Sequence, residues 1–436
     1  MDKIFIGMTL ICATFICNAA AQAQKNYKDP GEYTLFDAVV KDIDGNSFPK
    51  AIADLDAWKQ KYPDSDFKDD RQVFYVLAYA GAKRPEKALE AAAGLLANPG
   101  SLDAAKRVRV LYTAVAAIQQ IPNATPEQLN IGGKAARDLA VFDTAPEGVG
   151  PDAWVTARTQ LRLAARAALL YVALAPAAQA LTAKDCRRAE TAARQAIGEF
   201  PESAQAAGYL GEANLCLAQT EPARAPLAIY ELARAASLDP AKGSVDPQWQ
   251  RQSIEPALER VYNAYHGADP SGLAQLKDLA VKSPLPPEGF TILSAAEIAQ
   301  KKEADFEANN PELALWMRIK AALTAVDGEQ YFEMNVKDAA IPQLRGVLLE
   351  AKPACRPSEL RIAVTLPDAP QPLQPEIAVK LPKPLAGKPE LNGEIRWEAV
   401  ARAFTKDPFL LSMETESAKI QGLNVAPCAA PVKSRR

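Results

Sequence analysis

The sequence predicts a mainly α-helical chain, an α-solenoid of paired helices followed by a small antiparallel β domain. Two observations lead to this fold class. Over the first 284 residues, small or apolar side chains recur at helical spacing, and a proline closes each run. From about residue 343 onward, apolar residues alternate with polar ones, which is the period of a half-buried strand.

The helical part repeats one spacing pattern, with small or apolar residues at i, i+4 and i+7 and a proline five residues later. Residues at the first three positions share one helix face, and the proline ends the helix. Four segments carry the pattern: Ala51, Leu55, Trp58 and Pro63; Ala189, Ala193, Ala196 and Pro201; Ala228, Leu232, Ala235 and Pro240; Gly272, Leu276, Leu279 and Pro284. A looser copy, one residue short, is Ala88, Ala92, Leu95 and Pro99. The pattern indicates helix pairs at 32–63, 67–99, 102–146, 152–201, 204–240 and 247–284.

This pattern resembles the second helix of the tetratricopeptide repeat (TPR), a motif of about 34 residues with small residues at its helix contacts. The matching first-helix signature is Leu210-Gly211, in the stretch GYLGEANLCLA. It stands 17 residues before Ala228, against about 12 or 13 in the motif. The resemblance covers roughly residues 32–284 with degenerate copies, and the chain is similar to exported bacterial TPR proteins of unassigned role. It implies stacked hairpins whose concave groove binds protein partners or extended peptides.

Two glycines lie within that first helix, and each disfavours a helix by about 1 kcal/mol relative to alanine. Gly211 is expected at a crossing where two helix backbones touch. Gly208 is expected on the exposed or groove side. The predicted role of Gly211 is therefore structural.

The first residues predict a signal peptide over 1–23, with an apolar run over 4–17 and a small-x-small motif that ends at Ala23. The alternative is a lipoprotein, cleaved before Cys12 or Cys17, although isoleucine precedes each where a small residue is needed. The mature chain is expected in the periplasm or outside the cell, and not as a membrane-spanning protein.

Four further segments follow the signal peptide in the predicted domain order. They are the repeat array over 24–284, a linker with two helices over 285–340, a β domain over 341–425 and a tail over 426–436. The two helices are expected near 294–308 and 311–325. The alternating strand positions are Leu360, Ile362, Val364 and Leu366; Ile377, Val379 and Leu381; Ile395 and Trp397; and Phe409, Leu411 and Met413. About five strands in this order resemble an oligonucleotide/oligosaccharide-binding (OB) barrel, and an immunoglobulin-like sandwich fits almost as well.

Four cysteines remain after the signal peptide: Cys186, Cys216, Cys355 and Cys428. An even number in an oxidising compartment favours disulfides, with three possible connectivities. In a TPR stack, the helix that begins near Cys186 and the one that ends near Cys216 are adjacent and antiparallel. The resemblance therefore favours the pair 186–216. Cys355 precedes the strand at 359–366 and Cys428 follows the last strand, so the pair 355–428 would fix the tail to the β domain, and four buried free thiols are the alternative.

The sequence identifies no catalytic, cofactor-binding or metal-binding residues. Asp42-Ile-Asp44-Gly-Asn46 resembles the start of a calcium loop but has Ala53 at the twelfth position, and a plain turn is favoured. Gly132-Gly133-Lys134 lacks the other residues of a phosphate loop. His266, the single histidine, suits a helix C-terminus. A net charge of −3 gives no reason to expect nucleic acid as the first partner.

The predicted function is a non-catalytic interaction or scaffold protein of the cell envelope. Arg158, Arg162 and Arg166 form either a cationic stripe for carboxylates and phosphates or, as we favour, a solvated helix face. Further partner contacts are expected from a first helix, at Gln205, Glu212 and Leu215. A glycan or oligonucleotide binder that uses the β domain is the alternative, and an envelope hydrolase with a carboxylate pair is a third hypothesis.

Overall fold

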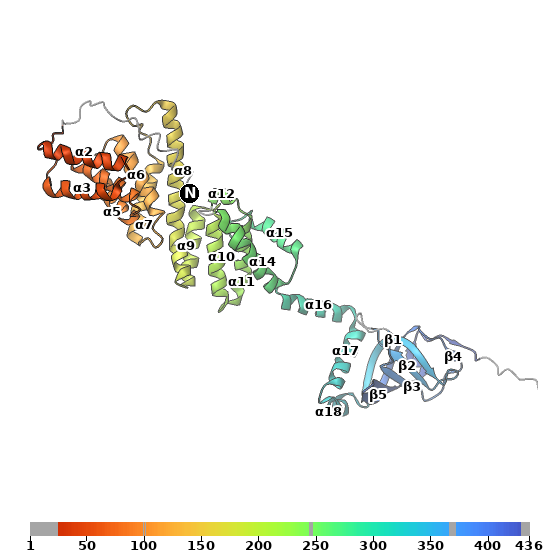
Figure 1. Ribbon diagram of the computed structural model, residues 1–436. Helices are drawn as coiled ribbons and strands as arrows, with labels where there is room; N and C mark the ends of the chain where they lie inside the picture. Colours follow the sequence, from red (N-terminus) through yellow and green to blue (C-terminus); the bar gives the residue numbers. More distant parts are fainter. Residues whose placement is uncertain (1–24, 99, 101, 244–246, 366–371, 429–436) are drawn as a thin grey trace, which may run out of the picture. The chain divides into compact units, whose positions relative to one another are not determined.

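The computed structural model describes residues 25–98, 100, 102–243, 247–365 and 372–428. The predicted signal peptide over 1–23 and most of the predicted tail lie outside the described residues. The chain forms two compact units that divide between Ser294 and Ala295. The first is helical, and the second combines helices with a β barrel (Figure 1).

The first unit has the repeat-like architecture of stacked helical hairpins, and a hairpin occupies each position where the sequence predicts a helix pair. The pairs are α2 (Pro30–Asp44) with α3 (Phe48–Lys61), α4 (Lys68–Gly81) with α5 (Pro85–Ala97), α6 (Ala104–Ile118) with α7 (Pro126–Ala140), α8 (Pro151–Thr182) with α9 (Cys186–Glu199), α10 (Ala204–Ala218) with α11 (Ala225–Ser237), and α14 (Glu255–His266) with α15 (Pro270–Ala280). Within the fifth pair, η2 (Pro222–Arg224) precedes α11. The last two pairs are connected by α12 (Pro240–Gly243), α13 (Pro247–Trp249) and the π-helical η3 (Gln250–Ile254).

Local sequence signals define where these helices begin. Asp29 caps α2 by accepting hydrogen bonds from the backbone amides of Gly31 and Glu32. Thr125 and Gln128 form a reciprocal capping box at the start of α7. Many of the helices also have proline in the first turn, where the missing amide hydrogen costs nothing.

Helix α8 has 32 residues, about twice the length of its neighbours, and connects the two halves of the helical unit. It contacts α6 and α7 along one part and α9 and α10 along another (Figure 1). Among the residues that the structure describes, α8 alone is long and apolar enough to cross a membrane by length and composition. A buried core helix passes the same test, and Leu161, Ala165 and Ala168 of α8 are at most 5% exposed.

Small residues let the helices approach each other closely. Ala193 of α9 is fully buried in a cluster with Leu170 of α8 and Leu210 of α10. A Cβ atom added to Gly211 would lie 2.9 Å from Leu232 Cγ and 3.2 Å from the Leu232 backbone nitrogen. Gly211 therefore lies where α10 and α11 cross, as the sequence predicts.

The expected position of Gly208 is wrong, because this glycine is buried. The indole of Trp249 lies over it, and an added Cβ atom would overlap the ring. Local helix periodicity did not reveal the contact, because Trp249 belongs to the irregular connection before α14. Both glycines of α10 therefore allow close packing, one against α11 and one against Trp249.

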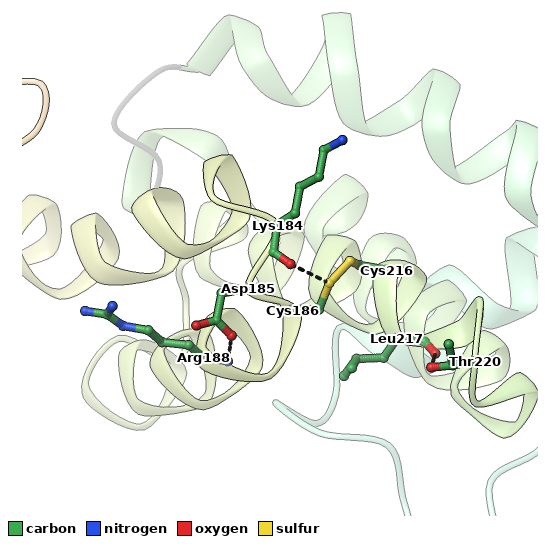
Figure 2. Close-up of a disulfide and its surroundings, with 7 residues drawn as sticks. All are labelled: Lys184, Asp185, Cys186, Arg188, Cys216, Leu217 and Thr220. Atoms are coloured by element: carbon green, nitrogen blue, oxygen red, sulfur yellow. Dashed lines mark hydrogen bonds between the residues drawn. A yellow bond between two sulfur atoms is a disulfide. The ribbon is translucent and has the colours of Figure 1, made fainter.

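Disulfides join the two predicted cysteine pairs. Cys186 at the start of α9 bonds to Cys216 near the end of α10, with 5.9 Å between their Cα atoms (Figure 2). Cys355 bonds to Cys428, with a Cα separation of 6.0 Å. The second bond fixes the segment after the last strand to the loop between the first two strands.

The second unit places four helical segments before an eight-stranded β region. The helical segments are α16 (Ala295–Asn309), α17 (Pro311–Thr324), α18 (Gly328–Tyr331) and the π-helical η4 (Phe332–Val336). The strands are β1 (Ala340–Lys352), β2 (Glu359–Ala363), β3 (Ile377–Lys380), β4 (Lys388–Pro389), β5 (Glu394–Lys406), β6 (Phe409–Glu414), β7 (Ile420–Gln421) and β8 (Val425–Ala426), with a 3-10 turn η5 (Ser417–Lys419) before β7. Strands β4 and β8 form a separate ribbon, and β7 extends the edge of β5.

Five strands close into a barrel, so the sandwich alternative is wrong. Strand β1 pairs with β2 at one end and with β5 at the other, which gives the order β1-β2-β3-β6-β5 around the ring. The expectation of a purely antiparallel domain is also wrong, because β3 and β6 are parallel, with Ile377 opposite Leu411. Five strands around a closed ring cannot all alternate in direction, so at least one neighbouring pair must be parallel.

The barrel core and helix α17 form one hydrophobic cluster. Trp397 of β5 is fully buried inside the barrel. Trp316 of α17 is also fully buried, and its indole nitrogen donates a hydrogen bond to Glu376, 3.2 Å away. Helix α17 therefore packs onto the barrel and belongs to its core.

We expect Gly211→Ala to lower the free energy of unfolding of the helical unit by about 1–3 kcal/mol, because the new methyl group overlaps Leu232. Gly94 of α5 is the matched control, since an added Cβ atom there meets nothing within 4 Å. Gly94→Ala should raise stability by about 0.5–1 kcal/mol. Urea denaturation followed by circular dichroism at 222 nm measures both, and equal effects at the two positions would contradict the crossing.

Removing the Cys186–Cys216 disulfide by a Cys186→Ser/Cys216→Ser double variant should destabilise the helical unit by about 3 kcal/mol. The bond closes a loop over a sequence separation of 30 residues, and opening it enlarges the unfolded ensemble. The same denaturation experiment tests this, with the Cys355→Ser/Cys428→Ser variant as control. A loss of helical stability in the control but not in the test variant contradicts the expectation.

Candidate functional site

The candidate site is the face of α10 that carries Gln205, Tyr209 and Glu212. These residues stand at i, i+4 and i+7 and therefore share one side of the helix. All three are half-buried. The amide nitrogen of Gln205 donates a hydrogen bond to the Tyr209 hydroxyl oxygen, 2.8 Å away, and so fixes the phenol ring.

Trp249 lies beside Tyr209 and completes the aromatic part of the site. The two rings meet edge to face, with 6.0 Å between their centroids. Gly208 beneath the indole leaves room for it on the surface of α10. The next residue, Gln250, is buried and donates to the carbonyls of Ala235 and Leu238 at 2.6 and 2.7 Å. Trp249 is therefore held in place from both sides.

Trp249 differs from the other tryptophans in its exposure. The chain has five tryptophans. Four of them are at most 8% exposed: Trp58, Trp154, Trp316 and Trp397. Trp249 is half-buried, so part of its ring remains accessible to a ligand.

Glu212 is the charged member of the site and is not compensated by any cation. It has no hydrogen bond or ion pair within the described part of the chain, and its electrostatic neighbour is Tyr209. Burial raises the pKa of the Glu212 carboxyl and of the Tyr209 phenol. We refer to Tyr209, Glu212 and Trp249 as the α10 cluster.

Tyr171 is an aromatic residue of the neighbouring helix α8. Its hydroxyl donates a hydrogen bond to the carbonyl of Ile121. Burial raises the pKa of the Tyr171 phenol. Helix α8 contacts α10 directly, so the preceding hairpin lies beside the helix that carries the α10 cluster.

A second carboxyl group with a raised pKa, Glu231 of α11, is sealed inside the protein. Its side chain is 1% exposed, and one carboxylate oxygen has no hydrogen-bond partner. Arg234 does not bond to it, because this guanidinium donates to the carbonyls of Pro201, Ala280 and Ser283 at 2.6–2.7 Å. Burial raises the pKa of Glu231 from 4.5 to about 8, against the charges of Arg234 and Arg194.

Glu212 and Glu231 lie on different helices, and within the described residues no hydrogen bond joins their carboxyl groups. Glu231 is also inaccessible to a substrate. The carboxylate pair required by the hydrolase hypothesis is therefore not found at these two residues.

The other predicted partner residues separate into two places. Leu215 lies on α10 but packs against the core formed by α11 and α14. Arg158 forms an ion pair with Asp143, and Arg166 lies 3.6 Å from Glu202, just before α10. Arg162 is exposed, with no ion pair in the described residues. Because two of the three arginine charges are balanced, the stripe offers little net positive charge.

The structure shows what the calcium-like loop, the Gly132-Gly133-Lys134 motif and His266 contact. The ammonium group of Lys50 lies 2.9 Å from both carboxylate oxygens of Asp42, where the calcium-like loop begins. Gly132 lies inside α7 and faces Ile118 of α6. The imidazole Nδ1–H of His266 donates to the Leu293 carbonyl, 2.8 Å away. Within the described ranges, no group of three or more His, Cys, Asp or Glu side chains is placed to hold a metal ion.

A shallow hollow of about 410 Å³ lies on the second unit beside the β4–β8 ribbon. Its lining residues are Lys388, Pro389, Glu390, Asn424, Val425 and Ala426. The carboxylate of Glu390 accepts a hydrogen bond from Asn424, so its polar groups are partly paired with each other. No aromatic side chain lines the hollow, and it offers fewer means of recognition than the α10 cluster.

Sequence reasoning selected Gln205 and Glu212 but missed Tyr209 and Trp249. Tyr209 stands between the two selected residues on the same helix face and was detectable by spacing alone. Gly208 signals a close approach, but only the fold shows that the approaching group is Trp249. Comparisons of this chain with protein-family models, with curated proteins and with solved structures find no match.

We expect the Glu231→Gln variant to change the pH dependence of stability. Because the folded-state pKa of Glu231 lies above its unfolded value, protonated Glu231 stabilises the fold fully below about pH 4.5. This stabilisation is lost as pH rises through about 8. Relative to the wild type, the variant should therefore gain stability between pH 5 and pH 8, on the order of 3 kcal/mol. Urea denaturation at the two pH values measures the gain. Glu259→Gln, at an exposed position of α14, is the control, and a pH-independent difference for Glu231→Gln would contradict the expectation.

Proposed function

We propose that this protein is a non-catalytic binding or scaffold protein of the cell envelope, with TPR-like hairpins that hold a polypeptide partner. The observation that carries the proposal is the α10 cluster, where a half-buried carboxylate without a partner in the described residues shares one helix face with Tyr209, which packs against Trp249. Leaving such a carboxylate uncompensated costs free energy, and the surface gains when a ligand compensates it.

Export is the second part of the proposal. Two disulfides fit an oxidising location, since such bonds are rare in reducing compartments. An apolar N-terminal run followed by small residues supports a cleaved signal peptide near Ala23. Partners would then be other envelope or secreted proteins, or extended peptides.

The alternative is a glycan or oligonucleotide binder that uses the barrel, whose five-stranded closed form supports a likeness to OB barrels. In OB barrels, ligands bind on the face of the second and third strands. Here the outward side chains of that face are the half-buried Glu359 and Arg361 and the exposed Lys380. The arginine is paired with the glutamate at 2.9 Å, and β2 and β3 contain no aromatic residue on which a base or sugar could stack. The helical unit is therefore the favoured binding surface.

A photo-cross-linking amino acid at Gln205 tests the function directly. Purified full-length protein that carries the probe is irradiated in an envelope extract, and a discrete cross-linked polypeptide is expected on gels and by mass spectrometry. The control places the probe at Gln195, an exposed residue of α9. Identical cross-links from both positions, or none from Gln205 in variants whose circular dichroism is unchanged, would argue against a partner surface on α10.

A further inference from the structure

We propose that the α10 cluster recognises a lysine or arginine side chain of an extended polypeptide. The inference rests on the proposed function and names the chemistry of its partner. Glu212 would form the ion pair, while Tyr209 and Trp249 would contact the hydrophobic stem and the cationic group.

The first argument is charge. Two other carboxylates in the helical unit, Glu32 and Glu190, are shielded from water and have partners supplied by the chain. Glu32 accepts hydrogen bonds from the Trp58 indole at 3.0 Å and the Lys28 amide at 2.6 Å. Glu190 pairs with Arg224 at 2.7 Å and Arg194 at 3.1 Å. Glu212 is shielded without such a partner, yet it remains accessible, so an incoming cation supplies what the chain does not.

The second argument is the aromatic surroundings. Cations bind over the faces of tryptophan and tyrosine, and the attraction grows when water is excluded. Trp249 is fixed by the contact with Gly208 and by the hydrogen bonds of Gln250, and Tyr209 is fixed by Gln205. Tyr209 lies on the same face of α10 as Glu212 and packs against Trp249, and this arrangement suits the long apolar stem and charged end of lysine or arginine.

The third argument concerns the other ligand classes. A metal ion needs several ligating groups, and the cluster has a single carboxylate. An anion would be repelled by Glu212. Gln205, Tyr209 and Glu212 extend over two turns of α10, a length that favours an extended polypeptide over a free amine.

The test uses synthetic peptide pools with randomised flanks and a fixed central residue. The central residue is lysine, arginine, glutamine, acetyl-lysine or glutamate in five separate pools. Immobilised full-length protein captures peptides from each pool, and mass spectrometry quantifies them. Titration with the enriched peptides is followed by tryptophan fluorescence, because Trp249 is the accessible indole while the other four are buried.

Wild-type protein should enrich the lysine and arginine pools at least tenfold over the glutamine and acetyl-lysine pools. Glu212→Gln should abolish the preference, and the matched control Glu259→Gln should retain it. Glu212→Gln removes an uncompensated acid, so its denaturation midpoint should not fall, and a loss of binding is then not a loss of folding.

Three outcomes overturn the inference. The first is equal capture of the pools, the second is a cationic preference that persists in Glu212→Gln, and the third is enrichment of the glutamate pool. Free lysine amide that binds as tightly as the peptides overturns the polypeptide part. If any of these occurs while the Gln205 probe still captures a partner, the recognition chemistry is wrong and the proposed function stands. If the Gln205 probe also captures nothing, the proposed function fails with it.

Discussion

The close contact between α10 and α11 at Gly211 determines the packing of the helical unit around the candidate site. Leu232 lies against the backbone of α10, in space that a methyl group on Gly211 would occupy. Ala206, Ala207 and Ala213 of α10 are also fully buried, so this helix presents small side chains on several sides. Because these side chains of α10 are small, the neighbouring helices pack closely around it. The indole of Trp249 can then lie directly on the helix at Gly208. The low helix propensity of the two glycines is offset by burial, which supplies most helical stability in proteins.

The positions of helices and strands could be predicted because their signals are local. Apolar spacing, capping residues and prolines lie within each element. The six helix pairs appear where these patterns place them, and the four alternating runs fall on β2, β3, β5 and β6. The role of Gly208 could not be predicted in this way. Its contact, Trp249, comes from a π-helical connection whose sequence has no repeat to indicate a partner. The site was accordingly half predicted: Gln205 and Glu212 follow from helix geometry, whereas the indole beside them follows only from tertiary structure.

The barrel illustrates the same limit for strands. Alternating side chains at Leu360 and Ile362, or at Ile377 and Val379, are equally compatible with a sandwich and with a barrel. What distinguishes the two is the pairing of β1 with both β2 and β5, a contact between distant parts of the chain. Gly346 stands where β1 changes partner, and an added Cβ atom would lie 2.5 Å from the carbonyl oxygen of Ala363. Closure with five strands then requires the parallel pair β3–β6, which no local pattern encodes.

Glu212 and Glu231 differ in whether a ligand can reach their buried carboxyl groups, and this difference separates a binding role from a structural one. Glu231 and Glu212 lie on neighbouring helices, and burial raises the pKa of both carboxyl groups. The Glu231 side chain is inaccessible to solvent, so only protonation can relieve the free-energy cost of burying its charge. This cost appears as a dependence of stability on pH. Glu212 is only half-buried, so an external cation can also relieve the free-energy cost of burying its charge. A buried group without a partner therefore becomes a recognition element only where the fold leaves it reachable, and Gly208 gives Trp249 room to pack against Tyr209 on the same helix.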